Sequence, residues 1–451
     1  MWIEREGKNT QFIQAVMSLK SQVLVVRGAR QVGKTSFILN ALKDLKEYRQ
    51  FNINLASPRQ TVIDGVDYFG RDFFGASENA EQLLYNISFS VGELDRLSQP
   101  LIIFIDEADR YPVSLEAIQT LAGLSNVLKI IYTGSNLENI AVKNVATGRK
   151  RYFDLYPIAF EDFLRAYSKD KELAYIKEIR LGEKQYSEMY HNRLIELFDL
   201  YMRLGGMPRI LDAFIDAQAN TQPIPQLVSD LAYTIEENVK TVLGEKSRLY
   251  EYEDILRKLA LLSMDTLKIS RLQVQHAGRS EVKKLVNKTV GARVAHKIRL
   301  YESGSDLSKY ILFDVGILNY LLNGSDLLRQ KIIEAHMAIH YETAVGNEIV
   351  ATLPSRDDIF YWKSERGAQV DFMLKSLHFI AVDVKSTGGT ARSLDSAAIY
   401  EKELEYIVKI CKQQPSLHPD HIAKITNLGL SRKIPFIVIP HYLSGRLTKL
   451  I

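Results

Sequence analysis

The segment with the clearest chemical pattern is GARQVGKT, which runs from Gly28 to Thr35. Gly28 and Gly33 allow the backbone to curl and to turn its N–H groups toward phosphate oxygens. Lys34 can then reach the β- and γ-phosphates of a nucleotide, and the Thr35 hydroxyl can ligate Mg²⁺. Ser36 follows in the same helical turn. The segment predicts a phosphate-binding loop (P-loop) with ATP and Mg²⁺ as cofactors.

A second pattern is the acidic pair that ends the segment LIIFIDE. Asp106 is placed to hold Mg²⁺ through water, and Glu107 is placed to orient and deprotonate the attacking water. A strand that ends in Asp-Glu is common on protein surfaces, so the pair gains its meaning from the P-loop. Together the two patterns favour an ATPase that carries its own base over a GTPase or a nucleotide kinase.

The elements that position these residues follow from apolar runs. Residues 23–26 (VLVV) are a short β-branched run before the P-loop, and SFILNALKDLKEY after it has helical periodicity. Strand, loop and helix in this order are the context that a P-loop requires. Further apolar strands are expected at 51–55, 101–105, 128–132 and 152–155. With crossover helices they predict a parallel sheet in an α/β core over residues 1–164.

The strand expected at 128–132 runs into Thr133, Gly134, Ser135 and Asn136. A polar side chain there, either Ser135 or Asn136, would lie between the two carboxylates and the γ-phosphate as a sensor. The alternative is an ordinary turn followed by a helix cap.

Beyond these residues, the sequence resembles a bacterial and archaeal family of AAA-type ATPases that carries a C-terminal domain of unknown function. No single later piece is specific, but their order is. The matching pieces are VVRGARQVGKTS, IIFIDEADR, IIYTGSN, GRKRYFDLYPIAFEDFL, LGGMPRI, KYILFDVGILNYLL, YETAVGNEIVATL, YWKSERGAQVDFMLK and AVDVKS. The resemblance implies an AAA-type parallel-sheet core, a helical lid, a winged-helix-like middle segment and a small α/β nuclease-like end.

The resemblance also implies roles for two arginines. Arg149, after Gly148, is the candidate arginine finger, which would offset γ-phosphate charge in cis or from a neighbouring subunit. The alternative is a basic turn that leads into a strand. Gly205, Gly206 and Pro208 match a lid motif that borders the nucleotide base; Arg209 beside them is either a phosphate sensor or a surface residue.

The middle of the chain is basic between residues 268 and 299. Only one acid, Glu281, accompanies its basic residues, which are Lys268, Arg271, Arg279, Lys283, Lys284, Lys288, Arg293, Lys297 and Arg299. Such a balance suits contact with the DNA phosphate backbone. The alternative is a solvated basic face that meets an acidic part of the same chain. Strands expected at 294–301 and 310–313 would form the wing of the winged-helix-like segment.

A second acidic pattern lies near the C-terminus. Asp371 and Asp383 fall on two expected strands, Lys385 follows, and Glu342 lies on the preceding helix. Asp, about a dozen residues, then Asp-x-Lys is the pattern of PD-(D/E)xK nucleases. There, Glu342, Asp371 and Asp383 would share a divalent metal and Lys385 would polarise the water or phosphate. Gln369 stands where the family pattern often has Glu, so a retained fold without catalysis is the alternative.

Composition and charge limit the partners and the location that can be expected for the protein. Among 451 residues the formal net charge is +4, so any nucleic-acid contact must be local. The single cysteine, Cys411, allows no intramolecular disulfide, and no apolar run approaches the ~20 residues that span a bilayer. The N-terminus lacks the apolar core of a signal peptide. A cytoplasmic protein without membrane contact is expected, with a homo-oligomer if Arg149 acts in trans.

These observations predict four domains: an ATPase core at 1–164, a helical lid at 165–245, a winged-helix-like domain at 246–325 and a nuclease-like domain at 326–451. The leading hypothesis is an ATPase coupled to DNA binding or processing. The second is a slow ATPase switch whose C-terminal domain binds DNA or a protein without cleavage. The third is an ATPase that acts on protein partners alone.

Overall fold

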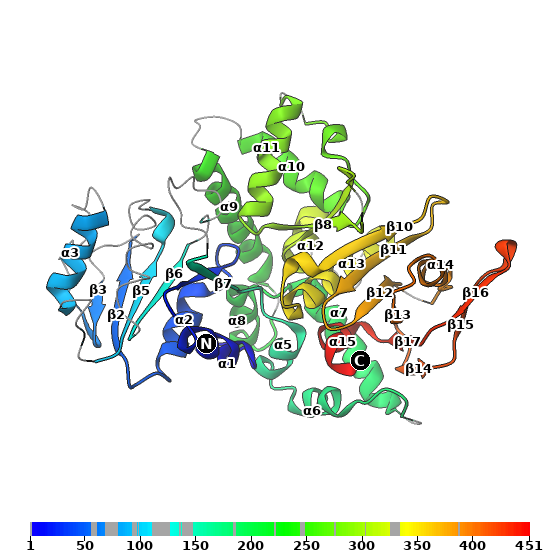
Figure 1. Ribbon diagram of the computed structural model, residues 1–451, viewed down its shortest axis with the longest axis horizontal. Helices are drawn as coiled ribbons and strands as arrows, with labels where there is room; N and C mark the ends of the chain where they lie inside the picture. The colour runs from blue at the N-terminus through cyan, green and yellow to red at the C-terminus, as the bar shows by residue number, and fades with distance from the viewer. Residues whose placement is uncertain are drawn as a thin grey trace.

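The computed structural model describes most of the chain. The described residues are 2–55, 61–67, 80–92, 97, 99–110, 127–134, 137, 148–183, 186–220, 222–243, 249–274, 277–302, 304–324, 334–386 and 388–451. Two large sheets lie at opposite ends of the molecule, with the helices α8 and α9 between them (Figure 1).

The N-terminal sheet has five parallel strands in the order β2-β5-β6-β1-β7. This confirms the expected α/β core. Its strands are β1 (Val23–Arg27), β2 (Arg49–Asn54), β5 (Leu101–Asp106), β6 (Leu128–Thr133) and β7 (Lys150–Asp154), and helices α1 (Lys8–Met17), α2 (Lys34–Leu42) and α3 (Ala80–Val91) accompany it. Strands β5 and β6 are buried along their whole length, as their apolar sequences require. Two short antiparallel strands, β3 (Thr61–Ile63) and β4 (Val66–Asp67), extend the sheet beyond β2.

A helical region follows the core, as the sequence predicts. It contains α5 (Phe160–Ala166), α6 (Asp170–Glu178), α7 (Glu188–Leu204), α8 (Pro208–Asp216), α9 (Ile224–Leu243), α10 (Leu249–Leu261) and α11 (Arg279–Gly291). Within the part of the chain that the structure describes, no helix has the length and apolar character that crossing a bilayer requires.

The C-terminal sheet has eight strands in the order β14-β17-β13-β12-β11-β10-β8-β9. Its strands are β8 (Ala295–Leu300), β9 (Ser308–Leu312), β10 (Ile359–Lys363), β11 (Gln369–Lys375), β12 (Phe379–Val384), β13 (Tyr406–Ile410), β14 (Ser416–His418) and β17 (Phe436–Ile439). Helices α12 (Val315–Asn323), α13 (Glu334–Thr352), α14 (Arg392–Tyr400) and α15 (Leu447–Leu450) and the hairpin of β15 (Ile422–Ile425) with β16 (Leu430–Lys433) complete this half.

The hairpin expected as a wing is part of this C-terminal sheet. Strands β8 and β9 pair antiparallel, and Arg299 and Leu300 of β8 pair in parallel with Phe360 and Tyr361 of β10. The boundary proposed at residue 325 therefore separates strands that share one continuous sheet.

Two glycine-containing motifs of the sequence pack against each other. Gly205 has φ 77°, and a Cβ there would lie 2.3 Å from Oδ1 of Asp314, so only glycine fits. Asp314 is the N-cap of α12: its side chain accepts the N–H groups of Gly316 and Ile317, at 2.9 and 3.0 Å. Its second oxygen accepts the N–H of Gly206 at 2.7 Å. One buried carboxyl thus joins the turn before α8 to the start of α12.

Replacing Asp314 with Ala should lower the free energy of unfolding by about 2–4 kcal/mol, because three buried N–H groups lose their acceptor. Urea denaturation monitored by circular dichroism measures this effect. The exposed Asp216, at the end of α8, provides the control, and Asp216→Ala should change stability little. Equal stability of the two variants would contradict the capping role of Asp314.

Candidate functional site

The P-loop connects β1 to α2 as the sequence predicts. Gly33 has φ 86° and precedes α2, and a Cβ on Gly28 would lie 2.4 Å from the carbonyl oxygen of Leu155. Both positions therefore require glycine. The Lys34 side chain is buried, and its Nζ donates to the carbonyl oxygens of Gly28 and Ala29, both at 3.0 Å. Its ammonium is thus fixed within the loop that would surround a phosphate.

The acidic end of β5 meets the start of α2. Thr35 Oγ1 donates to Asp106 Oδ2 at 2.7 Å, and the backbone N–H of Glu107 donates to Asp106 Oδ1 at 2.9 Å. A hydroxyl and a carboxylate that converge in this way are oxygen ligands of the kind that Mg²⁺ prefers. The residues present therefore fit the ion: Thr35 and Asp106 would hold it.

Glu107 lies beside this pair in an unusual backbone conformation. Its φ of 51° is in the left-handed region, which is uncommon for a residue other than glycine. Burial raises the pKa of its carboxyl, and Asp109 and Asp106 raise it further. Burial lowers the pKa of Lys34 to about 8, although Glu107, Asp109 and Asp106 oppose this shift. A carboxyl with a raised pKa next to the P-loop lysine has the properties expected of a base that accepts a proton from water.

Asp109 is a residue of this site that sequence reasoning missed. It lies in the 3₁₀ turn at Ala108–Arg110, and a Cβ on Gly134 would be 2.5 Å from its Oδ1. Asp109 therefore packs against the end of β6. Its position three residues after Asp106, on the turn that leaves the strand, was the available signal.

Three further residues were predicted at the nucleotide site, namely Ser36, Ser135 and Asn136. Ser135 and Asn136 lie outside the described residues. Thr133, before them, is buried and donates to the carbonyl oxygen of Val26 at 3.0 Å, which ties β6 to β1. Ser36 is exposed in the first turn of α2.

Arg149 lies at the opposite end of the sheet from the P-loop of its own chain. Its carbonyl oxygen accepts the N–H of Val23, at the first residue of β1, whereas the P-loop follows the last. Because β1 and β7 are parallel and five residues long, about 16 Å separate these ends. This position excludes contact with the nucleotide of the same chain and leaves the role in trans as a proposal.

The N-terminal segment contributes a second residue that sequence reasoning missed. The guanidinium of Arg5 is buried and donates to the carbonyl oxygens of Val32, in the P-loop, and Tyr156. Burial lowers its pKa to about 10. No sequence motif marks Arg5.

The lid motif of Gly205, Gly206 and Pro208 also adjoins the P-loop, since a Cβ on Gly33 would lie 3.5 Å from Pro208 Cγ. Arg209 itself is exposed.

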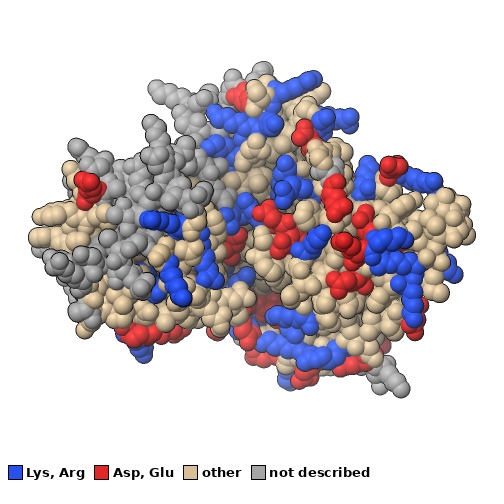
Figure 2. Space-filling view, viewed as in Figure 1, with Lys and Arg blue, Asp and Glu red and all other residues tan. Residues whose placement is uncertain are grey.

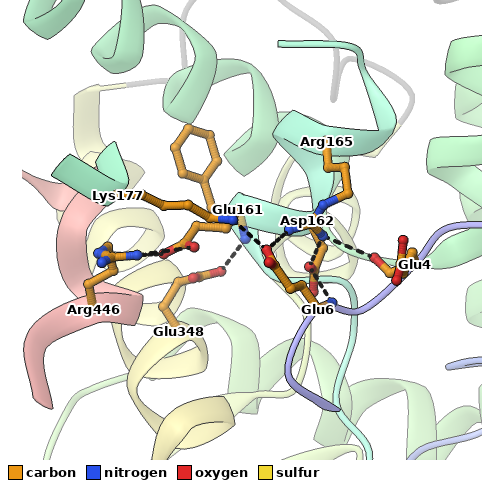
Figure 3. A network of polar contacts seen from close by, with 9 residues as sticks. Glu4, Glu6, Glu161, Asp162, Arg165, Lys177, Glu348 and Arg446 are labelled. Carbon is orange, nitrogen blue, oxygen red and sulfur yellow. Dashed lines mark hydrogen bonds and ion pairs between the residues drawn. The ribbon is translucent and has the colours of Figure 1, made fainter. Parts of the chain in front are cut away.

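A polar junction connects this region to the C-terminal half (Figure 3). We define the junction network as Glu6, Glu161, Asp162, Arg165, Lys177, Glu348 and Arg446. Glu6 contacts Arg165 and Lys177, the latter at 2.6 Å, and Glu161 contacts Arg446 at 3.4 Å. A cavity of about 290 Å³ lies among these side chains. The junction network therefore joins the N-terminal segment and α5 to the chain's last turns.

Glu348 is the most deeply buried member of the junction network. It accepts the N–H of Phe160, at the start of α5, at 2.9 Å, and it lies 3.1 Å from the hydroxyl of Tyr201. Burial raises its pKa to about 8. Glu348 lies on α13, the helix that also carries Glu342, so one helix reaches both the junction network and the C-terminal acids.

Most basic side chains of the segment 268–299 are exposed at the surface. Lys and Arg side chains gather over α10 and α11, at the top of the molecule in Figure 2. Arg293 is an exception, because it is buried and its Nη2 lies 3.3 Å from Asp154 Oδ1, at the end of β7. Seven of the nine predicted basic residues are exposed, namely Lys268, Arg271, Arg279, Lys283, Lys284, Lys297 and Arg299. Lys288 is partly buried.

The predicted C-terminal residues do come together. Asp371 on β11 and Asp383 on β12 lie within hydrogen-bonding reach of each other, and Lys385 Nζ lies 2.9 Å from Asp383 Oδ2. Burial raises the pKa of Glu342 well above its usual range, and Asp371 raises it further. We call Glu342, Asp371, Asp383 and Lys385, together with Lys309, the C-terminal cluster.

Lys309 on β9 is the member that sequence reasoning missed. Its side chain is fully buried, and its Nζ lies 3.2 Å from Asp371 Oδ1. Gln369, on the same face of β11 as Asp371, accepts a hydrogen bond from Thr266 at 3.1 Å. Among the described residues, no group of three or more His, Cys, Asp or Glu side chains is arranged to hold a metal ion. The donor set does not fit a divalent metal, because the fully buried ammonium group of Lys309 lies against Asp371.

Comparisons with known proteins agree with the first site. Residues 20–164 match the family model described as an AAA domain, which supports nucleotide binding and ATPase activity for this part of the chain. No curated protein matches the sequence.

Three solved structures are similar to parts of the chain. They are C. elegans PCH-2 (13% identity, 51% of this chain and 63% of that chain, TM-score 0.31), the Aeropyrum pernix ORC2 protein in its ADPNP-ADP complexes (11%, 71% and 91%, 0.34), and Drosophila ORC bound to DNA (13%, 70% and 85%, 0.28). The chain thus spans less than two thirds of the PCH-2 chain.

Proposed function

We propose that the protein is a Mg²⁺-dependent ATPase whose nucleotide cycle is coupled to DNA binding. The observation that carries the ATPase proposal is the 2.7 Å contact between Thr35 Oγ1 and Asp106 Oδ2. Lys34 precedes Thr35 in the chain, and Glu107 follows Asp106. In this arrangement Thr35 and Asp106 hold Mg²⁺, which offsets phosphate charge. Lys34 binds the phosphates, and Glu107 takes the proton of the attacking water.

The exposed basic surface supports DNA as the partner. Lys283 and Lys284 are exposed in the middle of α11, and Arg279 is exposed at its start. Lys297 is exposed on the neighbouring strand β8. Contacts between such side chains and phosphates give affinity that falls steeply with salt and depends little on base sequence.

One connection supports coupling between this surface and the nucleotide site. Arg293, just before β8, pairs with Asp154, which also binds Arg27 at 2.8 Å at the end of β1. Although burial raises the pKa of Asp154, Arg293 and Arg27 hold it below its usual value. The ion pair therefore connects the basic segment to the strand that leads into the P-loop.

The charge-reversal variant Lys283→Glu/Lys284→Glu tests the DNA surface. We expect it to bind duplex DNA at least about tenfold more weakly, with a smaller salt dependence, because each lost phosphate contact reduces the salt slope by about one. Fluorescence anisotropy over a salt series measures both. Lys43→Glu/Lys46→Glu, at exposed positions after α2, is the charge-matched control. If the Lys283→Glu/Lys284→Glu variant binds DNA like the wild type and like its control, the proposed DNA contact through α11 is wrong.

A second candidate function is a slow ATPase switch whose C-terminal domain binds DNA or a protein partner and does not cleave DNA. The position of Lys309 favours it, since this buried ammonium group lies 3.2 Å from Oδ1 of Asp371, a carboxylate that a nuclease would need for its metal.

A further inference from the structure

The C-terminal cluster has its own internal cation. Lys309 lies on β9 and Asp371 on β11, and β8 and β10 separate these strands in the sheet order. Even so, Lys309 Nζ lies 3.2 Å from Asp371 Oδ1 and 5.5 Å from the ring centre of Tyr361. The lysine thus lies between an aromatic ring and a carboxylate.

Both oxygens of Asp371 already have donors. Oδ1 faces the Lys309 ammonium, and Oδ2 accepts the backbone N–H of Val384 at 2.9 Å. Asp383 Oδ2 faces Lys385 at 2.9 Å and Ser393 Oγ at 3.5 Å. A divalent ion that bound both aspartates would have to lie close to these donors and share the carboxylate oxygens with them.

The two lysines differ in exposure, and this decides their roles. The Lys385 side chain is 35% exposed, so it can swing away from Asp383. The Lys309 side chain is 0% exposed, so its charge cannot leave the cluster without opening the fold. A buried charge that cannot move away repels a metal ion at close range, where the effective dielectric constant is low.

We propose that Lys309 is the resident counter-ion of the C-terminal cluster, so that the cluster is held together without a divalent metal. In this arrangement Lys309 balances Asp371 from within the protein, and the partly exposed Lys385 is the group left to meet an anionic partner.

Binding of Mn²⁺ to the full chain, measured by electron paramagnetic resonance without nucleotide, tests the proposal. Every protein in the series carries Thr35→Ala, so that the P-loop contributes no metal site. On this background we expect no Mn²⁺ binding that Asp371→Asn abolishes. Adding Lys309→Met should strengthen Mn²⁺ binding by at least about a hundredfold, because the repelling charge is gone. Adding Asp371→Asn to that variant should remove the gain.

The control is Lys129→Met, which removes a buried lysine from the other sheet. Lys129 Nζ donates to the carbonyl oxygen of Leu19 at 2.6 Å, away from the C-terminal cluster, so this change should leave Mn²⁺ binding unaltered. Mn²⁺ binding that needs Asp371 while Lys309 is present would overturn the proposal, as would a folded Lys309→Met protein that gains no binding. If circular dichroism shows that Lys309→Met does not fold, the comparison of Asp371→Asn with its Thr35→Ala parent decides the question.

Discussion

Replacing Lys34 with Met is expected to weaken ATP binding by at least about a hundredfold, since charge-assisted hydrogen bonds of about 1.5–3 kcal/mol each are lost. The Lys34 ammonium is held at the Gly28 and Ala29 carbonyls, and it is the buried cation of the P-loop. Methionine keeps the length of the side chain and removes the charge. Isothermal titration with a non-hydrolysable ATP analogue and Mg²⁺ measures the loss.

Lys43→Met is the control for this experiment. Lys43 is exposed immediately after α2, so its loss should leave ATP affinity unchanged. An unaltered affinity in Lys34→Met would place the nucleotide elsewhere on the chain.

Replacing Glu107 with Gln should have the second large effect, on turnover rather than on binding. The amide keeps the size of the side chain but cannot accept a proton, and loss of a general base reduces rates by about 10²–10⁴-fold. Thr35, Asp106 and Lys34 remain, so binding of Mg²⁺ and ATP should persist. Steady-state phosphate release and ATP-analogue titration, done on the same preparation, separate the two quantities.

Normal hydrolysis by Glu107→Gln would remove Glu107 from the role of base and direct attention to Asp109. Loss of binding together with hydrolysis would instead show that Glu107 holds the loop in place.

The nucleotide site could be predicted because its parts are local in the sequence. The P-loop needs a strand, a glycine-containing turn and a helix in direct succession, and the acidic pair needs only the end of one buried strand. Parallel strands then bring their carboxyl ends to one edge of the sheet, so Thr35 and Asp106 meet although 71 positions separate them. Arg5 contacts the same loop from a segment without a motif, so nothing local revealed it.

The C-terminal half was predictable element by element but not in its assembly. Alternation and turn residues indicated β8 and β9, yet β8 pairs with β10 through Arg299 and Phe360, which are 61 positions apart. A separation of 62 positions likewise concealed the contact of Lys309 with Asp371, because nothing local in the sequence relates the two residues.

Coupling between ATP hydrolysis and DNA binding can be measured as steady-state ATP hydrolysis during titration with duplex DNA, with the length of the DNA checked in the same samples. We expect Mg²⁺-dependent hydrolysis whose rate changes as DNA saturates the protein, while the DNA stays intact. The Lys283→Glu/Lys284→Glu variant should keep the basal rate and lose the response. Hydrolysis that saturating DNA leaves unchanged would contradict the coupling, and no hydrolysis by the wild-type protein would contradict the account as a whole.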